Sequence, residues 1–213
     1  MSVTDRTIVL AGATSLSGTA LAHALVDAGA RVIATGRSAE RLEELSAVGA
    51  RVEVADATSL DAMTELASRL DQVDAVIPLV GGWRGGGGLI GQTDDDFRAL
   101  LPALDAVRAT SRAFDSALRE SDAGRFAIVS STAVGRPLAG GANYAAVKAA
   151  SEAWTRAVAQ GFAKAARDAG QPLRAASVVF RARALDAESL IPRVLALWDG
   201  EAAELNDQVI TLD

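Results

Sequence analysis

The sequence has no cysteine and a single histidine, His23, among its 213 residues. The first absence excludes disulfides and thiolate chemistry, and the second excludes metal sites built from clustered histidines. No apolar run approaches the length of about 20 residues that a helix needs to span a bilayer. The N-terminal residues read as a first strand and not as a signal peptide. We therefore expect a cytoplasmic globular protein without a metal centre.

The chain also has no long segment in which charges of one sign are concentrated. Its formal net charge is −6, but acidic and basic side chains are interspersed, which argues against a nucleic-acid-binding surface. The three carboxylates of 94–96 have no histidine near them. We interpret them as the start of a helix, where anions suit the macrodipole.

Short apolar runs alternate with longer segments of helical pattern. Strands are expected at 7–11, 31–35, 51–54, 75–79, 126–130, 174–179 and 208–212. Helices are expected at 17–28, 38–46, 59–70, 94–120, 142–169 and 185–198. Strands that are apolar throughout are typical of a parallel sheet covered on both faces. This alternation predicts an α/β doubly wound parallel sheet of the Rossmann type, and residues 1–213 are expected to form a single NAD(P)-binding domain.

The turn after the first expected strand contains Gly12 and Gly18. The first glycine permits a tight turn and the second a close approach of helix to sheet. The helix N-terminus can then bind a pyrophosphate. Any strand-to-helix turn can hold two glycines, but their place in the first such turn favours nucleotide binding. The candidate cofactor-binding residues here are Gly12, Thr14, Ser15, Leu16 and Gly18.

Gly36, Arg37 and Ser38 follow the second expected strand, and none of them is acidic. A ribose 2′-hydroxyl favours a carboxylate at this place, whereas a 2′-phosphate favours a cation. We therefore predict NADP(H) as cofactor, although Arg37 could also be a solvated loop residue. Asp56, after the third strand, could accept a hydrogen bond from the adenine amino group or could cap a short turn.

Ser131, Tyr144 and Lys148 are the candidate catalytic residues. Tyr144 and Lys148 are four positions apart on an expected helix, so they share one face. A neighbouring ammonium favours the phenolate and lowers the pKa of a phenol, which is normally about 10. Ser131, at the end of a buried strand, can hydrogen-bond the oxygen that the phenol serves. A tyrosine four residues before a lysine is common on helices, so this pair counts only with the rest of the pattern.

A glycine-rich segment, 81–88, follows the fourth expected strand and contains Trp83. Such a run could be a flexible loop. Open parallel sheets bind ligands at the carboxyl ends of their strands, which favours a ligand-facing loop with Trp83 beside the nicotinamide or the substrate.

Together these residues resemble the short-chain dehydrogenase/reductase family, from Thr7 to Asp213. The resemblance implies hydride transfer between a nicotinamide cofactor and a carbonyl, imine or quinonoid substrate. It implies that Tyr144 donates the proton and that Ser131 polarises the substrate oxygen. It also implies that Tyr144 and Lys148 both contact the cofactor, with Lys148 on the nicotinamide ribose. It also implies a homodimer or homotetramer that pairs through helices 94–120 and 142–169.

The chain departs from the family pattern at several motifs. Leu16 stands at the third glycine, Pro78-Leu79-Val80-Gly81 at Asn-Asn-Ala-Gly, Leu104 at the relay asparagine, and Phe180-Arg181 at Pro-Gly. Gly81 remains a candidate cofactor contact. These departures count against a conventional proton relay. They do not affect the three candidate catalytic residues, Ser131, Tyr144 and Lys148.

Residues 180–207, between the last two expected strands, are too few for a long lid. An open, weakly selective site is therefore expected, with Trp83, Ser131 and Phe180 as substrate contacts. The loop from Val80 to Gly86 resembles that of quinonoid dihydropteridine reductases, whereas Ser131 favours ordinary carbonyl reduction. A further alternative is a non-catalytic NADP-binding regulatory protein of the same fold.

Overall fold

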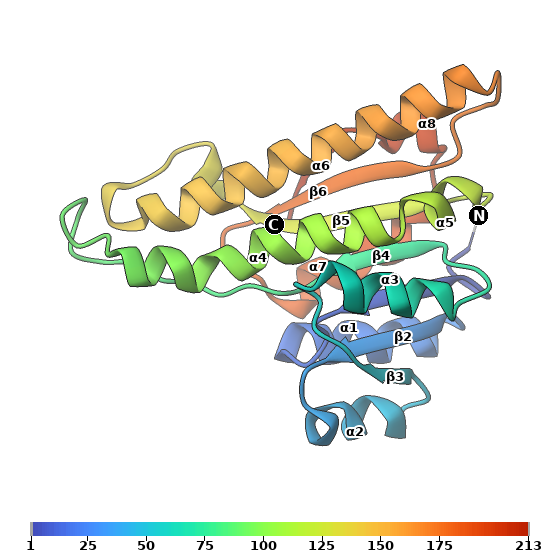
Figure 1. The fold of residues 1–213 in the computed structure, drawn as a ribbon, viewed down its shortest axis with the longest axis horizontal. Helices are drawn as coiled ribbons and strands as arrows, with labels where there is room; N and C mark the ends of the chain where they lie inside the picture. Colours follow the sequence, from blue (N-terminus) through green and yellow to red (C-terminus); the bar gives the residue numbers. More distant parts are fainter. Residues whose placement is uncertain (1, 213) are drawn as a thin grey trace.

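A computed structural model describes residues 2–212 and contains one seven-stranded sheet (Figure 1). The strands are β1 (Thr7–Ala11), β2 (Arg31–Gly36), β3 (Arg51–Val54), β4 (Ala75–Pro78), β5 (Arg125–Ser131), β6 (Ala176–Ala182) and β7 (Gln208–Thr211). Their order is β3-β2-β1-β4-β5-β6-β7, and all neighbours pair in parallel. The order reverses between β1 and β4, where doubly wound folds bind their ligands. The predicted Rossmann-type sheet is confirmed.

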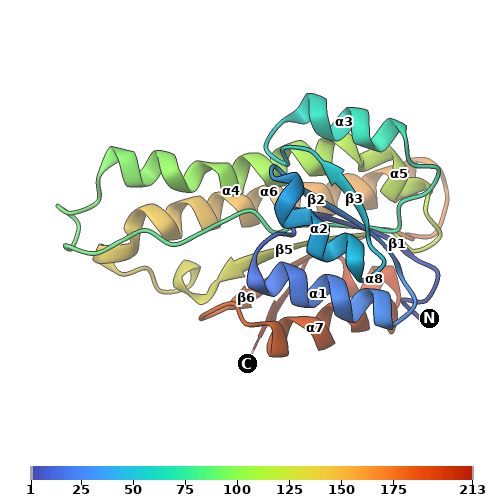
Figure 2. The same ribbon diagram turned by 90° about the horizontal axis from the view of Figure 1, so that it is seen from below.

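Helices cover both faces of this sheet (Figure 2). One face carries α1 (Leu16–Asp27), α2 (Ala39–Ala47) and α7 (Ala187–Leu195). The other carries α3 (Leu60–Ser68), α4 (Asp94–Ala113), α5 (Asp115–Glu120) and α6 (Ala142–Asp168). A short helix, α8 (Ala202–Leu205), contacts β6. Within the described residues, no helix combines the length and apolar character needed to cross a membrane.

Alternation along the strands explains why the sheet has two separate apolar cores. Successive side chains of a strand point to opposite faces. Ile8 and Leu10 accordingly pack in the core beneath α1 and α7. Val9 and Ala11 pack in the core beneath α3, α4 and α6. A run that is apolar throughout is therefore what a central strand with two covered faces requires.

Two expected boundaries are wrong. The helix expected over 94–120 is divided at Phe114, whose side chain is fully buried. Thr110 Oγ1 donates to Ala106 O at 2.6 Å, the kind of back-bond that bends helices. The sixth strand lies later than the expected 174–179, because it pairs with β5 until Ala182 meets Ser131.

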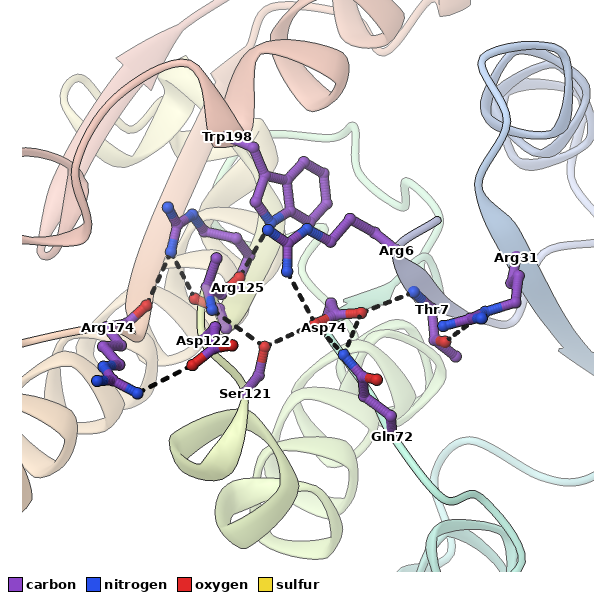
Figure 3. A network of polar contacts seen from close by, with 12 residues as sticks. Arg6, Thr7, Arg31, Gln72, Asp74, Ser121, Asp122, Arg125, Arg174 and Trp198 are labelled. Atoms are coloured by element: carbon purple, nitrogen blue, oxygen red, sulfur yellow. Dashed lines mark hydrogen bonds and ion pairs between the residues drawn. The ribbon is translucent and has the colours of Figure 1, made fainter. Parts of the chain in front are cut away.

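A polar network joins the amino ends of the strands (Figure 3). At its centre, the buried Asp74 carboxylate accepts hydrogen bonds from Thr7 N, Ser121 Oγ and Gln72 Nε2. Burial acts to raise the pKa of Asp74, but these hydrogen bonds outweigh it, so the pKa lies below its usual value. Buried Arg125 donates to the carbonyls of Leu197 and Arg174, and burial lowers its pKa to about 10. This network therefore stabilises the amino edge of the sheet. It uses no residue of the opposite, carboxyl edge, where doubly wound folds bind their ligands.

Candidate active site

Two cavities lie at the carboxyl ends of the strands and share one wall. The smaller, about 440 Å³, reaches toward the ends of β2 and β3. The larger, about 1080 Å³, reaches toward the ends of β5 and β6. Both are lined by Ser15 and by residues 79–82. They therefore form one continuous cleft over the point where the strand order reverses.

The turn between β1 and α1 has the close packing predicted for a phosphate-binding turn. Gly12 has φ +85°, and a Cβ there would lie 2.7 Å from Val80 Cγ2. A Cβ on Gly18 would lie 2.4 Å from Ala13 O. Ser15 caps α1 by accepting a hydrogen bond from Gly18 N at 3.1 Å. No acidic side chain occupies the first turn of α1, so a bound phosphate would meet the positive end of the helix without competition.

Leu16, at the position of the family's third glycine, begins α1 and is 94% exposed. Its side chain lines the larger cavity. An apolar side chain there is available to a ligand without weakening the turn, because Gly12 and Gly18 already provide the close approaches.

The smaller cavity contains two further cations that the sequence analysis did not identify, Arg41 and Arg84. Arg37 and Arg41 both line it, and Arg41 Nη2 donates to Thr14 O. Ser38 accepts from Arg41 N and caps α2. Arg41 lies in the first turn of α2, four positions after Arg37, and this spacing was the available signal.

Asp56 lines the same cavity, and its Oδ1 accepts hydrogen bonds from Thr58 N at 2.9 Å and Thr58 Oγ1 at 2.8 Å. The turn-capping interpretation therefore describes this structure. A carboxylate has about four lone-pair sites, so the cap leaves Asp56 able to accept a further hydrogen bond from a ligand.

Ser131, Tyr144 and Lys148 all line the larger cavity. Ser131 ends β5, and its Oγ accepts from Ala133 N at 3.2 Å. Tyr144 and Lys148 lie one turn apart on α6, with Lys148 Nζ 5.8 Å from the centre of the Tyr144 ring. The predicted common face is therefore present. Leu104, at the position of the relay asparagine, packs in a small apolar cluster with Tyr144.

The ammonium group of Lys148 has a hydrogen-bond acceptor, a backbone carbonyl, and it also feels the charge of a carboxylate one helical turn away. Its Nζ donates to Val129 O at 2.8 Å. Burial lowers the pKa of Lys148 to about 8, although the charge of Glu152 acts to raise it. Glu152 is one further turn along α6 and is 4% exposed. It forms a two-pronged ion pair with Arg181 at 2.8 and 2.6 Å.

The ion pair sets the charge of Glu152. Burial alone would raise the pKa of this carboxyl, but the hydrogen bonds from Arg181 lower it below its usual value. A negative charge therefore persists one helical turn beyond Lys148. The hydroxyl of buried Ser130, a residue that also lines the cavity, acts in the same direction as Arg181 on the pKa of Glu152.

The glycine-rich loop is attached to the start of α6. Gln92 Nε2 donates to the carbonyls of Gly86, Gly88 and Gly140, and Gly86 N donates to Gly140 O at 2.7 Å. Gln92 Oε1 accepts from Asn143 N at 3.1 Å. Helix α6 has no side-chain cap of its own, so Gln92 caps it from a distant segment. A lone glutamine in a loop gives no sequence signal for this role.

The attached loop holds Trp83 at the cavity. Trp83 lines the larger cavity and is 61% exposed. A Cβ on Gly85 would lie 2.4 Å from Gly140 O and 2.9 Å from Trp83 Cζ2. Glycine is therefore needed where the loop, the indole and the segment before α6 meet.

The expectation that Phe180 contacts substrate is wrong. Its side chain is 0% exposed and packs in the core beneath α1 and α7. The strand continues to Ala182, and the residues that reach the cavity are Ala182, Arg183, Ala184 and Leu185. Helix α7 then packs on the sheet with Leu190 and Val194 buried, so the segment between the last strands forms no lid.

Comparison with known proteins decides the family. The family model described as short chain dehydrogenase matches residues 6–166. The chain belongs to the short-chain dehydrogenase family. Comparison with curated protein sequences found no match.

Solved structures of the same fold cover nearly the whole of both chains compared. A short-chain dehydrogenase/reductase of Mycobacterium ulcerans has a TM-score of 0.84 at 19% identity, covering 100% of this chain and 90% of that one. A short-chain dehydrogenase of Salmonella enterica serovar Typhi has a TM-score of 0.84 at 18% identity, with coverages of 98% and 96%. A Shigella flexneri protein assigned to the short-chain dehydrogenases, complexed with NADP, has a TM-score of 0.82 at 19% identity, with coverages of 98% and 97%.

The described residues contain no group of three or more His, Asp or Glu side chains placed to hold a metal ion. The acidic run of 94–96 begins α4, whose cap is Thr93.

Proposed function

We propose that this protein is an NADP(H)-dependent oxidoreductase that acts on a carbonyl or hydroxyl group. The observation that carries the proposal is that Ser131, Tyr144 and Lys148 line one cavity whose wall continues into the phosphate turn at Ser15. A nicotinamide bound along the cleft would lie beside these three side chains. NADP(H), when bound, supplies or accepts the hydride.

The chain's own residues would handle the substrate oxygen. Tyr144 Oη transfers its proton to that oxygen as the carbonyl π bond breaks, and the product is an alcohol. Ser131 Oγ would donate a hydrogen bond to the same oxygen, which favours the charge that develops there. Lys148, cationic below pH about 8, favours the phenolate form of Tyr144 and is available to the nicotinamide ribose.

NADP(H) is favoured over NAD(H) by the cations of the smaller cavity. Arg37 and Arg41 line its wall, and no acid follows β2 before Glu40. A 2′-phosphate suits two guanidinium groups, which bind phosphate oxygens in pairs. Gly12, Thr14, Ser15, Leu16, Gly18 and Gly81 would surround the remaining phosphates and the nicotinamide.

We also propose that residues 1–213 work as one nucleotide-binding domain within a homodimer or homotetramer. Helices α4 and α6 are long and rich in alanine, and small side chains let helices of two subunits approach closely. Closed symmetry is the usual outcome of such contacts. Light scattering at micromolar concentration tests this, and a particle near 21.9 kDa would contradict it.

The function is tested by NADPH oxidation with small ketones, quinones and quinonoid pterins, in the wild type and in Tyr144→Phe. Loss of the hydroxyl should lower kcat by about 10²- to 10⁴-fold while NADPH affinity stays within about twofold. A decrease of less than about tenfold on any accepted substrate would contradict the proton-donor role.

Two other functions would give different results in the same assay. Turnover confined to quinonoid pterins would indicate a dihydropteridine-reductase-like enzyme, which the resemblance of the Trp83 loop favours. NADPH binding without turnover of any class would indicate a regulatory protein of this fold.

A further inference from the structure

The charged side chains that line the larger cavity are all cationic. They are Arg136, Lys148 and Arg183, and no Asp or Glu is among its lining residues. The chain as a whole has 27 acidic and 21 basic residues. A wall with three cations and no acid therefore departs from the composition of the protein, and it lies beside the candidate catalytic residues.

Arg136 and Arg183 emerge from neighbouring strands. Arg136 follows the short helix after β5, and Arg183 comes directly after β6. The ends of these strands are paired, with Ser131 opposite Ala182. Both arginines therefore belong to the half of the cleft beyond Ser131 and away from Arg37 and Arg41.

Both guanidinium groups remain available to a ligand. Within residues 2–212, neither side chain makes an ion pair or a hydrogen bond with another residue, and both are exposed. Arg181, two residues before Arg183, is by contrast committed to Glu152. An arginine offers five N–H donors in a plane that matches a carboxylate.

Apolar side chains lie in the same wall. Leu138 is 71% exposed, Trp83 61% and Leu185 41%, and all three line the larger cavity. The indole offers a flat face against which a planar group can stack. The cavity therefore combines a large apolar surface with positive charge.

We propose that the substrate is a planar, largely apolar carboxylate, with its anionic group held by Arg136 and Arg183 and its reducible group directed at Tyr144. This rests on the proposed function for the reaction, but the binding site itself does not require turnover. A bound anion could alternatively be the pyrophosphate of the cofactor, because Ser15–Ser17 line the same cavity as Arg183. The experiment separates these two sources.

Binding is measured by isothermal titration calorimetry with 2-naphthoate and with the uncharged 2-naphthamide, in the presence of saturating NADPH. The variants are Arg136→Gln, Arg183→Gln and the double variant. Arg193→Gln is the matched control, since Arg193 is exposed and lies on α7 outside the cavity. NADPH affinity is measured for every variant, and NADPH oxidation is followed with an aromatic keto acid and its methyl ester.

We expect naphthoate to bind about tenfold more tightly than naphthamide in the wild type and in the control. Each single substitution should reduce that preference about three- to fivefold, and the double variant should abolish it, with NADPH affinity unchanged. The preference should also weaken between about 50 and 500 mM salt, because exposed charges are screened.

Several outcomes would overturn the proposal. They are equal affinity for the two probes, no binding of either probe at millimolar concentration, or a naphthoate preference that survives both substitutions. Weaker NADPH binding in Arg183→Gln with an unchanged naphthoate preference would assign the cations to the cofactor and would equally overturn it. If naphthoate binds as expected but no keto acid is reduced, the proposed function fails while the carboxylate site stands.

Discussion

The side chain of Gln92 accepts a hydrogen bond from the backbone N–H of Asn143, the residue that precedes Tyr144. The same amide group donates to three carbonyls in the glycine loop and in the segment before α6. One side chain therefore links a wall of the cavity to the start of the helix that carries Tyr144 and Lys148.

Gln92→Ala should lower both stability and kcat/KM. It leaves the N–H of Asn143 without its cap, for which we expect a loss of about 1–2 kcal/mol in urea unfolding. The released loop should raise KM, and a less fixed Tyr144 should lower kcat, with a combined effect of about tenfold.

Gln92→Glu separates the two effects. It keeps the acceptor for Asn143 N and adds a charge that suits a helix N-terminus, but it loses the donated bonds to the loop. We expect kcat near that of the wild type with KM raised. Equal kinetics in Gln92→Ala and the wild type would contradict the linkage.

The pH dependence of activity should report the charge of Lys148. Its pKa, lowered by burial to about 8, predicts that activity falls as the pH rises through about 8, since the cation is then lost. Glu152→Gln removes the charge that acts to raise this pKa, so the alkaline fall should move to lower pH. The measurement is kcat/KM from pH 6 to 10.

Glu188→Gln is a matched control, because Glu188 is an exposed carboxylate on α7. Its profile should equal that of the wild type. Lys148→Arg, which keeps its charge throughout this range, should remove the alkaline fall near pH 8. An unchanged profile in Glu152→Gln would show that the carboxylate does not act on Lys148.

Cofactor preference should depend on Arg37. Arg37→Ala should weaken NADPH binding about fivefold or more by removing a charged partner of the 2′-phosphate. NADH binding should change little, which makes NADH the internal control in a fluorescence titration. Equal losses for the two cofactors would place Arg37 away from the 2′ position.

Asp74→Ala should destabilise the fold without acting on the cleft. Two buried donors, Thr7 N and Ser121 Oγ, lose their acceptor, and we expect a loss of about 3 kcal/mol at pH 7. The pKa of Asp74 is lowered in the folded protein, so its ionised form adds stability above the usual aspartate pKa of about 4. That contribution is lost as the pH falls toward the lowered value.

The measurement is urea unfolding of wild type and variant at pH 7 and pH 3. The difference in unfolding free energy should shrink at pH 3. A difference that stays constant would contradict the electrostatic account, and a change in NADPH affinity would contradict the separation from the cleft.

The sequence predicted the sheet well because local patterns determine it. The unbroken apolar run of β1 and the turn from Gly12 to Gly18 follow from residues close together in the chain. The spacing of Tyr144 and Lys148 likewise placed both on one face, as the helix period requires. Ser131 joins them because parallel strands bring their carboxyl ends to one edge.

The features that the sequence analysis predicted wrongly or did not identify depend on contacts between distant segments of the chain. Whether Phe180 faces the core or the cavity depends on its pairing with β5, and shifting a strand by one residue moves each side chain to the other face. The break at Phe114 depends on its burial against the sheet. Gln92 was missed because its partners, Gly140 and Asn143, are about 50 positions away.

The network around Asp74 and the cleft lie at opposite ends of the same strands. β1 has five residues, which corresponds to about 16 Å at 3.3 Å per residue. Substitutions farther apart than about 7–10 Å usually have additive effects. Directed evolution of this protein could therefore accumulate stabilising changes along the amino edge first. The stability gained there would offset the cost of destabilising substitutions, so the loops around Trp83 and Arg183 could then be diversified for new substrates.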